Sequence, residues 1–420
     1  MFVSDCLDIN AAGHLTIGGC DAVALAETFG TPLYVMDETA VREALREFKR
    51  AMDAYAAAGG RVAYASKACC FKELYRIVGE EGCGADVVSG GELYTALQAG
   101  FPAEWLYFHG NNKSDAELRM ALEAGVGRIV VDNPTELRRL SAIAGEMGKT
   151  APVYLRITPG VEAHTHSFIR TGQIDSKFGF TLESGEALQG AEEAVRLDAI
   201  ALKGFHCHIG SQIFDDEPFV HAAEVMLGFM DQVRQRTGTV AGELNLGGGF
   251  GAKYVESDRP KSRREMVRLV AGAVSKKAAD LGYPCPYLVL EPGRSVVADA
   301  GITLYTVGHV KKIPGVRTYV SVDGGMPDNP RYILYQSPYT ALIADRAGET
   351  PAETVTIAGR CCESGDLLQE NAPLQACTPG DTLAVLSTGA YNLSMASNYN
   401  RLPRPAVVMT KAGEARVVVR

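Results

Sequence analysis

A lone lysine, Lys67, ends the apolar segment 61–66, where a buried β-strand is expected to open into a loop. Lysine is strongly hydrated and is rarely placed at the end of a buried strand without a function. When burial or a neighbouring cation lowers its pKa, its amine becomes a nucleophile that attacks carbonyl carbon. Taken by itself, Lys67 is more simply a structural lysine that reaches solvent. The residues that follow the other predicted strands must therefore decide its role.

Polar or glycine-rich segments follow several other apolar runs. The clearest are 86–92, 205–211, 247–251 and 291–295. The glycines at 247–249 remove every Cβ from a loop, so that backbone N–H groups can surround an anion. Arg294 adds a cation in the segment after the next predicted strand. Together they predict a phosphate site.

A nucleophilic lysine beside a phosphate site is what an enzyme of pyridoxal 5'-phosphate (PLP) requires. This cofactor also needs an acid at its ring nitrogen, a flat contact against the ring and hydrogen bonds to its phosphate. Glu291 can be the acid and His208 can lie on the ring. Ser211 and Gly249 can serve the phosphate.

A metal site is the rival interpretation, because His206 and His208 are two residues apart on a predicted strand and would face the same way. A metal-dependent hydrolase needs further His and Asp ligands at neighbouring strand ends. The second histidine pair, His164 and His166, falls instead in a long loop. PLP is therefore the predicted cofactor, and no metal is predicted.

These residues need a scaffold that brings strand ends together. Short β-rich runs alternate with helical patterns between about residues 38 and 291. The predicted strands are 62–66, 85–88, 105–108, 128–131, 153–157, 203–208, 243–246 and 287–290, and predicted helices include 90–98, 114–123, 134–147, 218–236 and 263–281. The strands are almost continuously apolar, as parallel strands buried on both faces should be. Eight such units predict a TIM (β/α)8 barrel, whose active site lies at the carboxyl ends of the strands. A doubly wound sheet is the competing fold, but no GxGxxG motif opens the first helix.

The segment 296–420 has a different character. Its β-rich runs, 301–311, 317–323, 354–358, 382–386 and 404–410, are separated by Gly and Pro turns, which predicts an all-β domain. The first 35 residues also contain strand-like pieces. The predicted organisation is a PLP-binding barrel at 36–295 and a β-domain made of 1–35 and 296–420.

Composition narrows the class of protein. The net charge of −9 over 420 residues gives no basic patch for nucleic acid or anionic lipid. No run of 18 apolar residues is present, and Asp5 and Asp8 stand where a signal peptide would be basic, so neither a membrane span nor a signal peptide is expected. Ten cysteines without CxxC pairs indicate free thiols and a cytoplasmic protein.

The motifs taken together resemble those of the fold-type III PLP decarboxylases, whose fold is of the alanine racemase type. The motifs of that group are Tyr64-Ala65-Ser66-Lys67-Ala68, 84–93, 206–211, 247–251 and 291–295. Further motifs resemble the diaminopimelate decarboxylases: 164–166, 171–172, 176–179, 362–366, 389–391 and 397–400. The resemblance spans nearly the whole chain. One departure is Tyr332, where proline would be expected after Arg331.

The resemblance implies a role for each matching residue. Lys67 would bind PLP covalently, and Cys362 would be the proton donor. The cofactor would be held by Lys67, His208, Ser211, Gly249, Glu291, Pro292, Gly293, Arg294 and Tyr391. The substrate would be held by Arg294, Arg331, Tyr335, Glu363 and Tyr391. From residue type alone, Cys361 and Cys362 would be interpreted as two inert buried thiols.

The implied reaction is the decarboxylation of meso-2,6-diaminopimelate to L-lysine and CO2, the last step of lysine biosynthesis. The implied assembly is a homodimer in which Cys362 and Glu363 of one subunit complete the active site of the other. Two alternatives stay open: another amino-acid decarboxylase of the same fold, of the D-amino-acid or carboxynorspermidine type, and a catalytically inactive regulatory homologue. The long segment 164–179 is a candidate lid.

Overall fold

The structure is a computed structural model that describes residues 2–161 and 176–420. Packing divides the chain into two units. The barrel unit comprises Leu45–Gly251 and Pro260–Gly293, and the β unit comprises Met1–Ala44, Ala252–Arg259 and Arg294–Arg420. The domain boundaries predicted from the sequence stay a prediction, because close packing does not show which part folds by itself.

Within the described residues, the barrel unit contains eight parallel strands that close on themselves. In chain order they are β5 (Gly60–Ala65), β6 (Gly84–Val87), β7 (Leu106–Phe108), β8 (Arg128–Val131), β9 (Ala151–Thr158), β11 (Ile200–His206), β12 (Glu243–Asn245) and β13 (Tyr287–Leu290). The closure is made by β13, which pairs with β5. A further short strand, β10 (Phe180–Thr181), extends the edge of β9. This arrangement confirms the predicted (β/α)8 barrel.

The interior of the barrel is a packed core. Ala63, Tyr107, Val130, Tyr154 and Val289 come from five different strands and form one buried cluster. Inward-pointing side chains from several strands fill a TIM barrel in this way, so the barrel has no open channel. The chemistry is therefore restricted to the ends of the strands.

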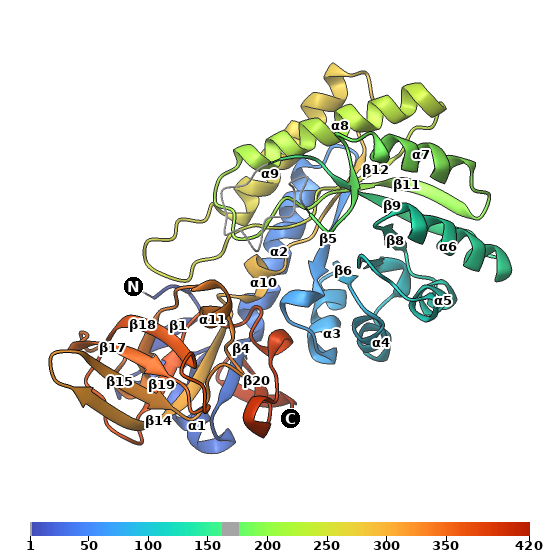
Figure 1. Ribbon diagram of the computed structural model, residues 1–420. Helices are drawn as coiled ribbons and strands as arrows, with labels where there is room; N and C mark the ends of the chain where they lie inside the picture. The colour runs from blue at the N-terminus through green and yellow to red at the C-terminus, as the bar shows by residue number, and fades with distance from the viewer. Residues whose placement is uncertain (1, 162–175) are drawn as a thin grey trace. The chain divides into compact units, whose positions relative to one another are not determined.

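Helices follow the strands on the outside of the barrel (Figure 1). They are α3 (Lys72–Glu80), α4 (Gly90–Gln98), α5 (Asp115–Ala124), α6 (Pro134–Glu146), α7 (Glu186–Arg196), α8 (Glu217–Thr237) and α9 (Arg263–Asp280). Several begin at side-chain caps: Ser89 caps α4, Ser114 forms a capping box with Glu117, and Asn133 caps α6 ahead of Pro134. Such caps satisfy N–H groups that have no partner inside the helix. The five helices predicted from the sequence are all present, and α3 and α7 add to them.

The β unit is built on a mixed sheet with the strand order β18-β17-β15-β14-β4-β20-β21; β19 also pairs with β14, and β16 pairs with β19. Its strands are β4 (Leu33–Asp37), β14 (Gly301–Ile313), β15 (Arg317–Val322), β16 (Ala341–Ile343), β17 (Glu353–Ala358), β18 (Leu367–Leu374), β19 (Thr382–Val385), β20 (Ala406–Lys411) and β21 (Glu414–Val419). Strand β4 lies between β14 and β20, so both ends of the chain share this sheet. Their apolar side chains form one core, which includes Leu15, Leu33, Ile302 and Val408.

Among the described helices, none is both long and apolar enough to cross a lipid bilayer.

Candidate active site

Lys67 lies at the carboxyl end of β5, where the strand turns into the short 3-10 helix Ser66–Ala68. Its neighbours Ser66 and Ala68 are buried, whereas Lys67 itself is exposed. The backbone there is fixed on both sides: Ala65 N donates to Pro292 O at 3.0 Å, and Ser66 N donates to Asp86 Oδ1 at 3.0 Å. A rigid strand end therefore presents an accessible amine.

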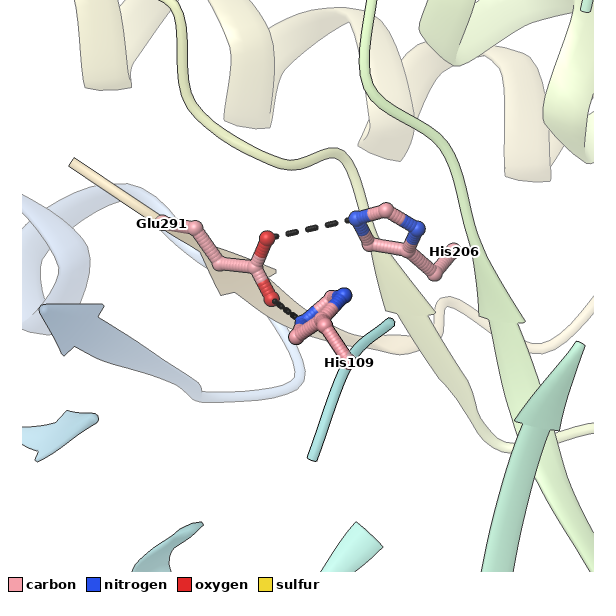
Figure 2. A group of neighbouring side chains, drawn as sticks. All are labelled: His109, His206 and Glu291. Carbon is pink, nitrogen blue, oxygen red and sulfur yellow. Dashed lines mark hydrogen bonds and ion pairs between the residues drawn. The ribbon is translucent and has the colours of Figure 1, made fainter. Parts of the chain in front are cut away.

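Glu291 follows β13, the strand that pairs with β5. Its carboxylate is 6% exposed and accepts hydrogen bonds from two histidines (Figure 2): His109 Nε2 lies 2.7 Å from Oε1, and His206 Nε2 lies 3.2 Å from Oε2. Asn245 Nδ2 donates to Oε1 at 2.6 Å. Burial by itself would raise the pKa of Glu291, but His109 and His206 hold it well below its usual value. Glu291 is therefore a buried anion.

His109 and Asn245 were missed by the sequence analysis, and His206 was considered only as a metal ligand. The signal that could have found them is their position. His109 directly follows β7, and His206 and Asn245 are the last residues of β11 and β12. All three thus lie at the strand ends where a barrel carries its chemistry.

The metal interpretation required His206 and His208 to face one ion. In the structure His206 faces Glu291, whereas Nδ1 of His208 accepts a hydrogen bond from Gly248 N at 3.3 Å. His109, His206 and Glu291 do bring three potential ligand atoms within 4.8 Å of one another. The Nε2 atoms of both histidines, however, already point at the carboxylate as hydrogen-bond donors, so the three ligand atoms are engaged with one another.

His208 and the glycine loop after β12 form a second part of the site. Burial, with the charges of Lys67 and Arg156, lowers the pKa of His208 well below its usual value, so its ring is neutral. A Cβ on Gly248 would lie 2.0 Å from Glu291 O. Gly249 has φ +106, and a Cβ there would lie 2.4 Å from Gly210 O. Only glycine fits this close approach of two strand ends, which leaves the backbone of the loop without side chains.

Two acidic residues near Lys67 complete the barrel part of the site. Asp86 lies on β6, where burial and the charge of Glu291 raise its pKa well above the usual value against the opposing charge of Lys67. Glu92 lies in the first turn of α4, and burial likewise raises its pKa although it accepts a hydrogen bond from Val88 N at 2.7 Å. Both carboxyl groups therefore take up protons more readily than in water, whereas Glu291 does not.

In the β unit, the structure brings together Arg294, Arg331 and Tyr391. Arg294 lies 4.7 Å and Arg331 lies 5.9 Å from the ring centre of Tyr391, each measured from the guanidinium carbon. Tyr254 lies between them, because it accepts a hydrogen bond from Arg294 at 2.6 Å and its ring is 5.1 Å from Arg331. Two buried cations on aromatic rings form a site that can bind anionic groups.

Arg331 begins the short helix α11 (Arg331–Tyr335) and is buried. It donates to Tyr339 Oη at 3.0 Å and to Ser337 Oγ at 3.1 Å. Tyr332, the residue that replaces the expected proline, donates to Glu370 at 3.0 Å and does not interrupt the helix. Tyr335 is the last residue of α11 and is partly buried. Tyr254 and Tyr339 were not predicted, because their contact with Arg331 depends on the fold.

Cys362 and Glu363 lie on the loop between β17 and β18 and are both exposed. Cys362 N donates to Asn400 Oδ1 at 2.8 Å, and Glu363 Oε1 accepts from Gly365 N at 3.2 Å. The adjacent Cys361 is partly buried, and burial raises the pKa of its thiol to about 12. The two cysteines therefore differ: Cys362 is accessible, and Cys361 is an inert thiol. Of the candidate lid 164–179, the part up to residue 175 lies outside the described residues.

Comparisons with known proteins agree with this geometry. Residues 39–298 match the family model of the pyridoxal-dependent decarboxylases, pyridoxal binding domain. The chain is 53% identical to the diaminopimelate decarboxylase of Bacillus subtilis (strain 168) over 422 residues, which cover 100% of this chain and 95% of that protein. It is 49% identical to the enzyme of the same name from Halalkalibacterium halodurans, again over 100% of this chain and 95% of the other. The crystal structure of diaminopimelate decarboxylase from M. jannaschii in complex with L-lysine superposes with a TM-score of 0.93 at 36% identity, covering 100% of this chain and 96% of that one.

Proposed function

The chain belongs to the diaminopimelate decarboxylases, within the pyridoxal-dependent decarboxylases, and we propose that it converts meso-2,6-diaminopimelate to L-lysine and CO2. It is accordingly a PLP-dependent carboxy-lyase, and this reaction is the last step of lysine biosynthesis. The observation that carries the proposal is the pairing of β5 with β13, because it places the accessible Lys67 and the buried anion Glu291 on neighbouring strand ends.

The residues present fit PLP. Lys67 offers an amine for covalent attachment, Glu291 offers a fixed negative charge, and His208 offers a neutral ring. The loop 247–249 is one that any Cβ would obstruct, so its backbone can approach a phosphate. We assign the cofactor contacts to Lys67, His208, Ser211, Gly249, Glu291, Pro292, Gly293, Arg294 and Tyr391.

Bound PLP supplies an electron sink for the electron pair that stays on the substrate when CO2 leaves. The residues of the chain direct this chemistry. Glu291 keeps a proton on the ring nitrogen, because a buried carboxylate stabilises a cation beside it. Lys67 would hold the cofactor through its amine, would release it to the amine of the substrate and would bind it again when the product leaves. His208 would lie against the ring of the cofactor and would exclude water from one face.

Cys362 is the proton donor in this proposal. Loss of CO2 breaks one carbon–carbon bond and leaves its electron pair on the α-carbon. The thiol of Cys362 delivers a proton to that carbon, and the resulting thiolate regains a proton from solvent. The exposed position of Cys362 supports this role, because such a thiol can reach both substrate and water.

The far end of the substrate explains the choice among amino-acid decarboxylases. Diaminopimelate carries an ammonium and a carboxylate there, whereas lysine and ornithine carry only an ammonium. Arg331 with Tyr335 can bind the carboxylate, and Glu363 can bind the ammonium. We assign Arg294 and Tyr391 to substrate binding as well. Lysine lacks this carboxylate and would leave the buried arginine unpaired. The kcat/KM for lysine should therefore be about 10⁴-fold lower than that for diaminopimelate.

We further propose a homodimer whose subunits share their active sites, so that Cys362 and Glu363 of one subunit act with Lys67 of the other. Their exposure on a loop of the β unit supports this arrangement.

A cytoplasmic location is also proposed, and it is supported by the ten cysteines, all of which are free thiols. We also propose that the chain is divided into a barrel domain at 36–295 and a β-domain made of 1–35 and 296–420.

A substrate comparison tests the proposed reaction. The purified protein, loaded with PLP, is assayed for CO2 release from meso-diaminopimelate, lysine, ornithine, a D-amino acid and carboxynorspermidine. Release from meso-diaminopimelate alone is expected. Preference for another substrate would contradict the assignment in favour of a related decarboxylase. Absence of turnover, together with absence of a yellow colour that borohydride bleaches, would indicate an inactive homologue.

A further inference from the structure

The carboxylate of Glu291 is held from three strand ends at once. His109 follows β7, His206 ends β11 and Asn245 ends β12. Oε1 accepts hydrogen bonds from His109 at 2.7 Å and Asn245 at 2.6 Å, and Oε2 accepts one from His206 at 3.2 Å. Three donors from separate elements leave the carboxylate little freedom to rotate.

The donors are neutral groups. Burial lowers the pKa of both histidines, to about 4 for His206. The charge of Glu291 raises both pKa values, but by less than burial lowers them. Both imidazoles are thus uncharged near neutral pH and donate through Nε2–H. Neutral donors orient the carboxylate without cancelling its charge, which an arginine in their place would do.

The acceptor sites of the Glu291 carboxylate show whether it can accept a further hydrogen bond. A carboxylate has about four lone-pair sites, two on each oxygen. Among the described residues, Oε1 accepts two hydrogen bonds and Oε2 accepts one. Oε2 therefore keeps one site for a further donor.

The three donors are themselves held in place. Lys113 Nζ is buried and donates to Gly110 O at 2.7 Å, Val130 O at 2.8 Å and Glu136 Oε1 at 2.6 Å, which fixes the loop after His109. Asn245 Oδ1 accepts from Gly247 N at 2.8 Å. The rings of His109 and His206 pack edge to face with their centres 4.7 Å apart (Figure 2). These contacts restrain the donors from the sides that do not face Glu291, although Nδ1 of His206 is buried without a hydrogen-bond partner among the described residues.

We propose that His109, His206 and Asn245 are positioning residues that hold Glu291 in one orientation. In this orientation the remaining acceptor site on Oε2 would accept a hydrogen bond from the protonated ring nitrogen of the cofactor. This inference rests on the proposed function, in which Glu291 keeps that nitrogen protonated. The protonation of the ring nitrogen then depends on three residues whose hydrogen-bond donors contact Glu291 and not the cofactor.

The test uses the holoenzyme loaded with PLP that carries ¹⁵N at the ring nitrogen. The ¹⁵N chemical shift distinguishes a protonated from an unprotonated ring without any turnover. His109→Phe removes the donor and keeps a ring of similar size, and His109→Gln keeps an N–H donor. The wild-type and His109→Gln enzymes should give the protonated signal. His109→Phe should move the signal toward the unprotonated position and lower kcat about tenfold or more, with a change in KM below about threefold.

A matched control separates this effect from a loss of stability. Phe205 precedes His206 on the same strand and packs on Phe229 of α8, with ring centres 4.9 Å apart. Phe205→Leu should lower the thermal stability but leave the ¹⁵N signal unchanged. If His109→Phe does not fold, His206→Leu and His206→Gln provide the same comparison at Oε2.

A protonated ring in both His109→Phe and His206→Leu, with full cofactor loading, would overturn the inference. So would one divalent metal ion per chain in the purified holoenzyme, since it would assign these residues to a metal. The proposed function fails separately: if the ¹⁵N shifts behave as expected but meso-diaminopimelate is not decarboxylated, the substrate is wrong and the positioning role stands.

Discussion

The Nε2 atom of His109 lies 2.7 Å from Oε1 of Glu291, although 182 residues separate the two in the chain. They follow β7 and β13, strands that are not neighbours in the sheet. The contact exists because the barrel closes and directs the ends of all its strands toward one region. A side chain can then meet a partner from a strand on the other side of the ring.

The first prediction concerns Lys67. Lys67→Ala should abolish covalent attachment of the cofactor and nearly all turnover, because Lys67 is the one lysine among the described residues of β5 and the 3-10 helix that follows it. Borohydride reduction followed by peptide mapping measures the attachment. Lys72→Ala, at the exposed start of α3, is the matched control and should retain both. Cofactor fixed to a peptide without Lys67 would disprove the assignment.

The second prediction concerns Arg331. Arg331→Ala should lower kcat/KM for diaminopimelate far more than it weakens cofactor binding, because the buried guanidinium is assigned to the remote carboxylate. Arg331→Lys keeps the charge but loses the paired contacts with Tyr339 and Ser337, and should give an intermediate loss. Steady-state kinetics and cofactor titration measure the two effects. A change in kcat/KM below about threefold, well under 1 kcal/mol, would contradict the carboxylate contact.

The third prediction separates the two adjacent cysteines. Cys362→Ala should reduce kcat by about 10²-fold or more, the usual effect of removing a general acid. Cys361→Ala should retain most activity, because burial raises the pKa of that thiol to about 12 and its side chain is less accessible. Rates of CO2 release measure both. Equal losses in the two variants would show that the loop matters only for folding.

The fourth prediction concerns the dimer. Lys67→Ala and Cys362→Ala homodimers should each be nearly inactive. When they are mixed, unfolded and refolded together, about half of the dimers should be hybrids in which one site carries both lesions and the other carries neither. Activity should return to about a quarter of the wild-type value if pairing is random and the sites are independent. Confirmed hybrids without recovery would place both residues in one chain.

The fifth prediction concerns stability at acid pH. Burial lowers the pKa of His206 from 6.5 to about 4 in the folded protein. Between these values the unfolded chain binds a proton that the folded chain does not. The free energy of unfolding should therefore fall as the pH drops from about 6.5 to 4, by up to about 3 kcal/mol from His206.

Denaturation of the cofactor-free protein, followed by the fluorescence of its single tryptophan, Trp105, measures this loss in the barrel unit. His206→Gln cannot take up the proton and should flatten the pH dependence. An unchanged slope in His206→Gln would mean that other groups cause the acid sensitivity.

Much of the barrel was predictable from local pattern. Parallel strands buried on both faces must be apolar along their length, and runs such as 128–131 and 287–290 appear in the structure with those bounds. Lys67 and Glu291 were also identifiable, because a charged residue directly after such a run is unusual and the fold places strand ends together. Their neighbouring positions then followed from the order of the strands.

The partners of these residues could not be found in this way. His109 and Asn245 are ordinary polar residues at strand ends, and only the closed barrel shows that both donate to Glu291. Tyr254 likewise contacts Arg331 only because distant segments of the β unit pack together, and Tyr339 contacts it because the chain turns back after α11.

The sequence by itself determined the barrel and singled out Lys67 and Glu291 as the candidate nucleophile and the candidate acid, because each depends on residue type and on the local period of apolar side chains. The tertiary structure decided which groups hold that acid and in what charge state. Hydrogen bonding and desolvation depend on distances of a few ångströms between residues far apart in the chain, and no local pattern specifies them.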